Sequence, residues 1–152
     1  MKTLANEDDE QLIVQRLLQI DSTCEGRWGR MTAAGMVCHL NDSFRVAIGE
    51  REAQSRSNWM MRSAFKWVGL WLPAKWPHGV KTVPECDQET GGTPPAEFAA
   101  DVTELLRLLE IFTTQPREFT WQPHPIFGEM TDKEWMRWGY LHMDHHLRQF
   151  GV

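Results

Sequence analysis

The sequence predicts an all-α protein, a four-helix bundle formed by a single domain over residues 1–152. Three observations indicate this class. Four segments carry apolar residues at helical spacing, and each of them begins with a capping residue or an acidic turn. No segment shows the alternating pattern of a convincing strand. A chain of 152 residues, 41% of them hydrophobic, is also long enough to bury one sizeable core.

The first two predicted helices cover about residues 6–20 and about residues 32–48. The first opens with acidic residues, which suit the positive end of the helix dipole, and carries leucines and isoleucines at helical spacing. The second has Thr32 as its predicted N-cap and ends before Gly49. Its predicted apolar face consists of Met36, Val37, Leu40, Phe44 and Ala47.

Two further helices are predicted in the second half of the chain. Thr93 followed by Pro94 marks the start of the third, because a capping residue precedes a proline at a position where no N–H partner is required. This helix continues through EFAADVTELLRLLEIF at 97–112. The pair Thr131 and Glu134 forms a capping box, so the fourth helix starts there and contains the stretch YLHMDHHLRQF.

About 44 residues connect the second and third helices, which is far more than a bundle turn requires. Within this crossover, NWMMRSAFKWVGLWL predicts an extra helix, and a loop rich in proline and glycine follows from Trp76 to Gly92. A second long loop, residues 113–130, contains WQPHPIFGEM. Long loops in compact domains often carry function, although they can simply cover the bundle.

The stretch YLHMDHHLRQF places three histidines on the last helix. His142 and His146 are four residues apart, about 40° around the helix axis, so both can bind one metal ion. Taken alone, the pair fits a polar helix face equally well. His145 is about 100° from His146 and is expected outside the metal's ligand set, as an orienting, packing or solvent-facing residue.

His39 is the predicted third ligand, because it lies on the apolar second helix, where an unpaired buried imidazole is costly. A lone histidine there is otherwise more often a hydrogen-bonded core residue. Three neutral histidines with an open position are the arrangement expected of a catalytic divalent metal. Asn41, Asp42 and Gln149 could orient the imidazoles, or they could be ordinary polar helix residues.

The heights of the histidines along their helices favour one topology. His39 lies roughly 10 Å into the second helix, and the pair on the last helix lies roughly 16 and 22 Å from its start, at about 1.5 Å per residue. The three rings therefore converge if these two helices run antiparallel. With the third helix antiparallel to the fourth, the order becomes up-down-down-up, and the long crossover makes this connection feasible.

The net charge of -5 argues against nucleic-acid binding, which depends on clustered basic residues. Residues 51–81 are nevertheless basic and contain four of the eight tryptophans. The segment 59–76 could be an interfacial membrane helix, but a helix that covers the bundle or forms a homodimer contact is favoured. No stretch is apolar enough for stable membrane insertion, so a cytoplasmic location is expected. Three cysteines without framework spacing predict packed thiols.

The segments WGRMTAAGMVCHLNDSF and HPIFGEMTDKEWMRWGYLHMDHHLRQFG resemble the DinB-like superfamily of metalloenzymes, over nearly the whole chain. The resemblance implies a four-helix bundle with the unusual topology above. It also implies a metal, commonly zinc or nickel, held by His39, His142 and His146. Some relatives are S-transferases that use a low-molecular-weight thiol, and others are metal-dependent isomerases or hydrolases. A small-molecule substrate is therefore expected.

An alternative is a metal-binding or stress-related interaction domain in which the ion only stabilises the bundle. One further histidine bears on the choice. His124 lies between two prolines in the loop before the last helix, where it could contact substrate or act as an acid or base. A structural role in the loop is the more common one for such a residue.

Overall fold

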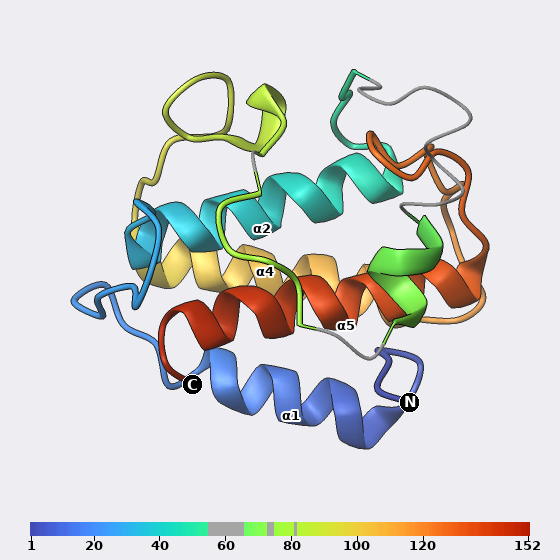
Figure 1. The fold of residues 1–152 in the computed structure, drawn as a ribbon, viewed down its shortest axis with the longest axis horizontal. Helices are drawn as coiled ribbons and strands as arrows, with labels where there is room; N and C mark the ends of the chain where they lie inside the picture. Colours follow the sequence, from blue (N-terminus) through green and yellow to red (C-terminus); the bar gives the residue numbers. More distant parts are fainter. Residues whose placement is uncertain (55–65, 73–74, 81) are drawn as a thin grey trace.

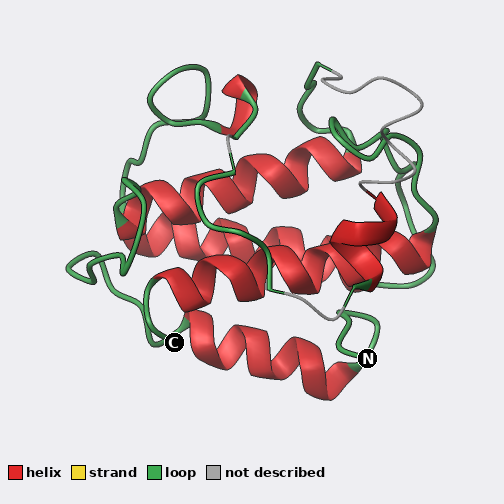
Figure 2. Ribbon diagram, viewed as in Figure 1, coloured by secondary structure: helices red, strands yellow, loops and turns green. Residues whose placement is uncertain are grey.

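The computed structural model describes residues 1–54, 66–72, 75–80 and 82–152. Its elements in chain order are α1 (Glu7–Leu17), α2 (Ala33–Ile48), the short 3-10 helix η1 (Pro84–Cys86), α4 (Phe98–Thr113) and α5 (Asp132–Gln149). Residues 66–71 are also helical. These ranges contain no strand, only an isolated bridge between His124 and Gly128. The all-α class is thus confirmed for the described part of the chain (Figure 2).

The long helices lie side by side. α2 packs against α4, and α1 packs against α5, which also contacts α2. In Figure 1, α1 and α5 run toward the left of the view, whereas α2 and α4 run toward the right. The second and last long helices therefore run in opposite directions.

Local side-chain chemistry determines where most of these helices begin. The Thr32 side chain accepts a hydrogen bond from the Gly35 N–H and starts α2, which ends at Gly49 in the left-handed conformation (φ 87°). Thr131 and Glu134 form the predicted capping box of α5. The starts predicted from these capping residues are confirmed.

Aromatic side chains from three helices meet in the core. The rings of Phe44 on α2 and Phe112 on α4 meet edge to face at 4.8 Å, and Trp138 of α5 lies 5.8 Å from Phe44. Gly139 allows this close packing, because a Cβ there would lie 2.6 Å from Leu4 Cδ1 and 3.0 Å from Phe112 Cε1. Edge-to-face aromatic contacts add to the free energy gained from burying these large rings.

The predicted start of the third helix was wrong. Thr93 donates both its backbone N–H and its hydroxyl to the buried carboxylate of Asp42, each at 2.7 Å, so its side chain is not available to cap a helix. α4 begins instead at Phe98, with the Glu97 carboxylate accepting from two backbone N–H groups. The first helix is also shorter than predicted, because α1 ends at Leu17.

Asp42 fixes the crossover to α2. Besides Thr93, its carboxylate lies 3.3 Å from Arg51 and 3.5 Å from Arg45, and its side chain is fully buried. A buried carboxylate needs this number of charged and polar partners to offset its lost hydration. The end of the crossover is consequently held beside α2, at the position where η1 also contacts this helix.

The extra helix predicted in the crossover falls mainly outside the described residues. Its described part, residues 66–71, is helical and inserts Leu70 into the core, while Trp67 is 61% exposed.

No described helix is both long and apolar enough to cross a membrane. The cysteines Cys24, Cys38 and Cys86 are all free, in agreement with the prediction of packed thiols.

Candidate metal centre

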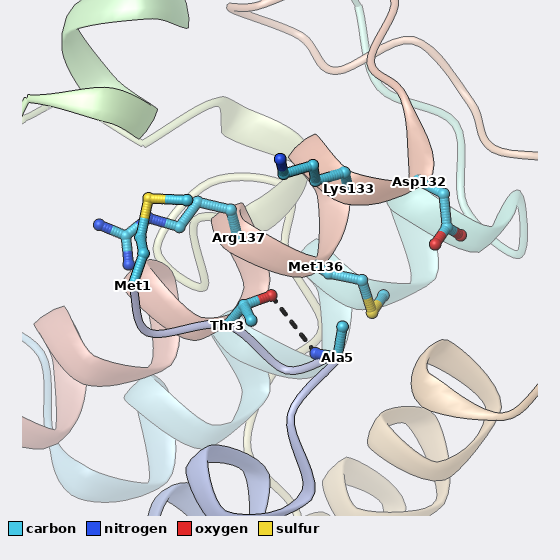
Figure 3. Close-up of a pocket in the computed structure, with 7 residues that line it drawn as sticks. All are labelled: Met1, Thr3, Ala5, Asp132, Lys133, Met136 and Arg137. Carbon is cyan, nitrogen blue, oxygen red and sulfur yellow. Dashed lines mark hydrogen bonds between the residues drawn. The ribbon is translucent and has the colours of Figure 1, made fainter.

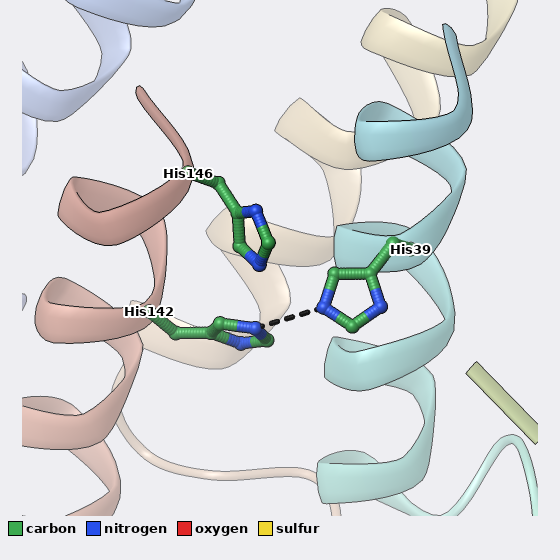
Figure 4. A group of neighbouring side chains, drawn as sticks. All are labelled: His39, His142 and His146. Carbon is green, nitrogen blue, oxygen red and sulfur yellow. Dashed lines mark hydrogen bonds between the residues drawn. The ribbon is translucent and has the colours of Figure 1, made fainter. Parts of the chain in front are cut away.

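His39 of α2 meets His142 and His146 of α5 between the two helices. Figure 4 shows the three rings turned toward one another from the two facing ribbons. One nitrogen from each ring lies within 4.8 Å of the other two, and the Nε2 atoms of His39 and His142 are 3.0 Å apart. The side chains are nearly buried, with exposed fractions of 5%, 8% and 7%.

The His39 ring is oriented by the crossover. Its Nδ1 lies 2.8 Å from the backbone carbonyl oxygen of Cys86, the last residue of η1. A carbonyl can only accept, so Nδ1 carries the proton and Nε2 presents a lone pair to the centre of the group. The position of the crossover therefore sets the tautomer of the first histidine.

Gln149 orients the His146 ring in the same manner. The amide oxygen of Gln149 lies 2.9 Å from His146 Nδ1, and its amide nitrogen donates to the Trp28 carbonyl oxygen, also at 2.9 Å. Because the amide donates to a carbonyl on one side, its oxygen must face the imidazole and accept the Nδ1 proton. His146 Nε2 is therefore free to act as a ligand atom. Of the two roles that the sequence left open for Gln149, the structure shows the orienting one.

His142 differs from the other two histidines. Its Nδ1 is buried and has no hydrogen-bond partner among the described residues. If Nε2 holds a metal, Nδ1 carries a proton without an acceptor. In the metal-free group, Nε2 must donate to His39 Nε2, and Nδ1 is then an acceptor without a donor. Either tautomer leaves one hydrogen-bonding capacity of this ring unused.

Burial keeps all three imidazoles neutral. It lowers the pKa of His39, and it lowers the pKa values of His142 and His146 well below 6.5, where the neighbouring histidines act in the same direction. Neutral imidazole is the form that binds metal ions. A group of three uncharged nitrogen donors suits zinc or nickel, whereas magnesium and calcium prefer oxygen ligands. The residues thus fit a divalent metal ion of intermediate softness, such as zinc or nickel.

A family model matches residues 3–151 of the chain, nearly its entire length. The chain belongs to the DUF1569 family. The family is described as a protein of unknown function. Neither a curated protein nor a solved structure matches the chain.

His124 is not part of the histidine group of this DUF1569 protein. Its Nδ1 accepts from the backbone N–H groups of Ile126 and Phe127, each at 3.1 Å, and its ring stacks on Phe127. Desolvation lowers the pKa of His124 to about 3. These contacts stabilise the turn that precedes α5, which is the structural role weighed for this residue.

His145 lies beside the group and is partly buried. Its ring is 5.1 Å from that of His146 and about 6 Å from the rings of Trp28 and Trp76. Burial is the main reason that its pKa is lowered to about 4. The aromatic surroundings were not predicted, because Trp28 and Trp76 come from loops whose placement has no periodic signal in the sequence.

The thiols near the group are not activated. Burial raises the pKa of Cys38 to about 12 and that of Cys86 to about 11, so both remain protonated at neutral pH.

A cavity of about 250 Å³ lies where the N-terminus meets the first turns of α5 (Figure 3). It contains no histidine or cysteine, and its lining residues are Met1, Thr3, Ala5, Asp132, Lys133, Met136 and Arg137.

Proposed function

We propose that this DUF1569 protein is a divalent-metal-dependent enzyme of the DinB-like superfamily, with the up-down-down-up bundle of that group. One observation carries the proposal: three neutral, buried imidazoles converge from two helices, and outer hydrogen bonds turn the Nε2 atoms of His39 and His146 inward. The opposite directions of α2 and α5 support the topology (Figure 1).

His39, His142 and His146 would hold the ion, most favourably zinc or nickel. With three protein ligands, such an ion supplies a position at which water is acidified or the thiolate of a substrate binds. The protein's own contribution is to keep the three rings neutral, to fix their tautomers through Cys86 and Gln149, and to limit access of bulk water. A low-molecular-weight thiol is the proposed cosubstrate of a transferase reaction on a small molecule.

A structural metal is the second candidate, and the near-complete burial of the three ligands favours it. In that case the ion would stabilise the contact between α2 and α5 without taking part in a reaction. Against it stands the ligand count, because structural zinc sites are usually closed by four protein ligands. The group found among the described residues has three members.

Metal content tests both candidates. Protein purified from metal-replete medium without chelator is expected to contain about one zinc or nickel ion per chain by elemental analysis, in keeping with a three-ligand site. His39→Ala and His146→Ala should lose the ion. His145→Ala is the matched control, because it removes a neighbouring imidazole from outside the group and should keep the ion. Wild-type protein without metal would exclude both candidates.

Reactivity separates the two candidates. The metal-loaded protein is screened for conjugation of low-molecular-weight thiols to electrophiles, with the His146→Ala variant as the inactive reference. Thiol conjugation that depends on the metal supports the enzyme. Inactivity across the screen, combined with a large loss of thermal stability on metal removal, supports the structural role.

A further inference from the structure

Four aromatic side chains from three parts of the chain gather beside the histidine group. They are Trp28, Trp76, His78 and His145, and they form what we call the aromatic wall. The rings of Trp28 and His78 stack at 3.9 Å with an angle of 11° between their planes. His145 lies 6.0 Å from the Trp28 ring and 6.4 Å from the His78 ring. The wall thus joins the loop after α1, the crossover and α5.

Trp76 connects this wall to the proposed metal ligands. Its ring centroid lies 6.0 Å from those of both His142 and His145. The indole N–H donates to the Gly69 carbonyl oxygen at 2.7 Å, so the ring is held in place by the helical turn at 66–71. A tryptophan fixed in this way presents a rigid aromatic face beside the histidines.

The two histidine rings near Trp76 each carry a buried nitrogen without a partner in the described part of the chain. His142 Nδ1 and His145 Nδ1 are both buried, and neither has a hydrogen-bond partner among the described residues. Buried polar atoms in folded proteins are nearly always hydrogen-bonded, so these two imidazole nitrogens have hydrogen-bonding capacity for a group from outside the chain. The histidines that have partners, His39 and His146, do not contribute to this feature.

We propose that Trp76, His142 and His145 form a binding subsite for a planar group that carries a carbonyl or carboxylate oxygen, as in an aromatic carboxylate. The planar body would lie against the Trp76 face. The oxygen would accept from His142 Nδ1, which carries the proton whenever Nε2 holds the metal ion. This inference rests on the proposed function, since it names the class of molecule that the same site receives.

Three probes distinguish the contributions of flatness, bulk and charge. Benzoate has a flat ring and a carboxylate, cyclohexanecarboxylate has a similar bulk without a flat face, and acetate has the carboxylate alone. Binding to the zinc-loaded protein is measured by isothermal titration calorimetry. We expect the dissociation constant of benzoate to be about tenfold lower than that of acetate, which is about 1.4 kcal/mol and typical of one aromatic contact. Cyclohexanecarboxylate should bind more weakly than benzoate.

Trp76→Ala should remove most of the preference for benzoate over acetate. Trp67→Ala is the matched control, because Trp67 is 61% exposed on the same helical turn that anchors Trp76 and should leave the preference unchanged. His145→Ala should weaken the binding of both carboxylates. If Trp76→Ala loses helical circular dichroism, Trp76→Leu is measured instead, since leucine keeps apolar bulk without a flat face.

Equal affinity of the wild type for benzoate and acetate would overturn the proposal, and so would an unchanged preference in the Trp76 variant that stays folded. Zinc content is determined for each sample, so that failure of the subsite is distinguished from failure of the metal site. A zinc-loaded protein without the preference contradicts only the subsite. A wild-type protein that binds no zinc contradicts the proposed function, and the proposal for the subsite falls with it.

Discussion

Replacing Gln149 by leucine tests how the outer hydrogen bonds support metal binding. Gln149 is buried, with an exposed fraction of 4%, and connects His146 Nδ1 to the Trp28 carbonyl oxygen at 2.9 Å on each side. In Gln149→Leu the imidazole loses the acceptor that fixes its tautomer. Loss of such a partner typically lowers metal affinity about 10–100-fold, or about 1.4–2.8 kcal/mol of binding free energy.

Gln149→Glu separates the two hydrogen bonds of this side chain. Its carboxylate still accepts from His146 Nδ1, so zinc affinity should stay close to that of the wild type. It cannot donate to the Trp28 carbonyl, so the free energy of unfolding of the metal-free protein should fall by about 1–3 kcal/mol. Gln15→Leu is the control, because it makes the same chemical change at an exposed position of α1.

Zinc affinity is measured by competition with a chromophoric chelator of known affinity, and stability by urea denaturation of the metal-free proteins. The predicted order of zinc affinity places the wild type, Gln15→Leu and Gln149→Glu together, with Gln149→Leu at least tenfold weaker. If Gln149→Leu bound zinc as tightly as the wild type, the orienting role of this amide would be refuted.

Three other perturbations test the core, the crossover and the histidine turn. Phe44→Ala should destabilise the protein by about 3–5 kcal/mol in urea denaturation, because it leaves a cavity between three helices. Asp42→Ala should lower the free energy of unfolding by about 3–5 kcal/mol and weaken zinc binding, because it releases the crossover that orients His39. Unchanged protease sensitivity of residues 82–93 in this variant would argue against the role of Asp42. The pKa of His124 is lowered from 6.5 in the unfolded chain to about 3 in the folded protein. As the pH falls from 6.5 to about 3, His124 is protonated in the unfolded chain but not in the folded protein, so the free energy of unfolding decreases over this range. Between pH 7 and pH 5 the wild type should lose about 2 kcal/mol more unfolding free energy than His124→Asn, and equal losses would contradict the lowered pKa.

Helix starts could be predicted wherever the capping hydrogen bonds form within the first turn of the helix. Thr32 and the Thr131–Glu134 box are of this kind, because each capping hydrogen bond joins residues three positions apart in the sequence. Thr93 had the same local signal, and the prediction failed there because Asp42, 51 residues away, takes both of its hydrogen-bond donors. A distant carboxylate of this kind has no local signature.

In the histidine group too, local sequence predicts some features and the tertiary structure decides others. Helical periodicity places His142 and His146 on one face of α5, and the apolar surroundings of His39 indicate that it points inward. The acceptor of His39 Nδ1 is the backbone carbonyl of Cys86. Every residue carries a backbone carbonyl, so the residue type at this position gives no sign of the contact. Which carbonyl reaches the imidazole depends on how the crossover returns to α2.

The sequence by itself determined the helical class, the caps of α2 and α5, and the histidines that face inward from these two helices, because each depends on helix geometry and on interactions within one turn. The tertiary structure decided which groups orient those histidines, that Thr93 serves the crossover instead of α4, and that Trp28, Trp76 and His78 gather beside His145. The physical reason is that these contacts join loops far apart in the chain, and neither periodicity nor capping chemistry limits where such loops come to lie.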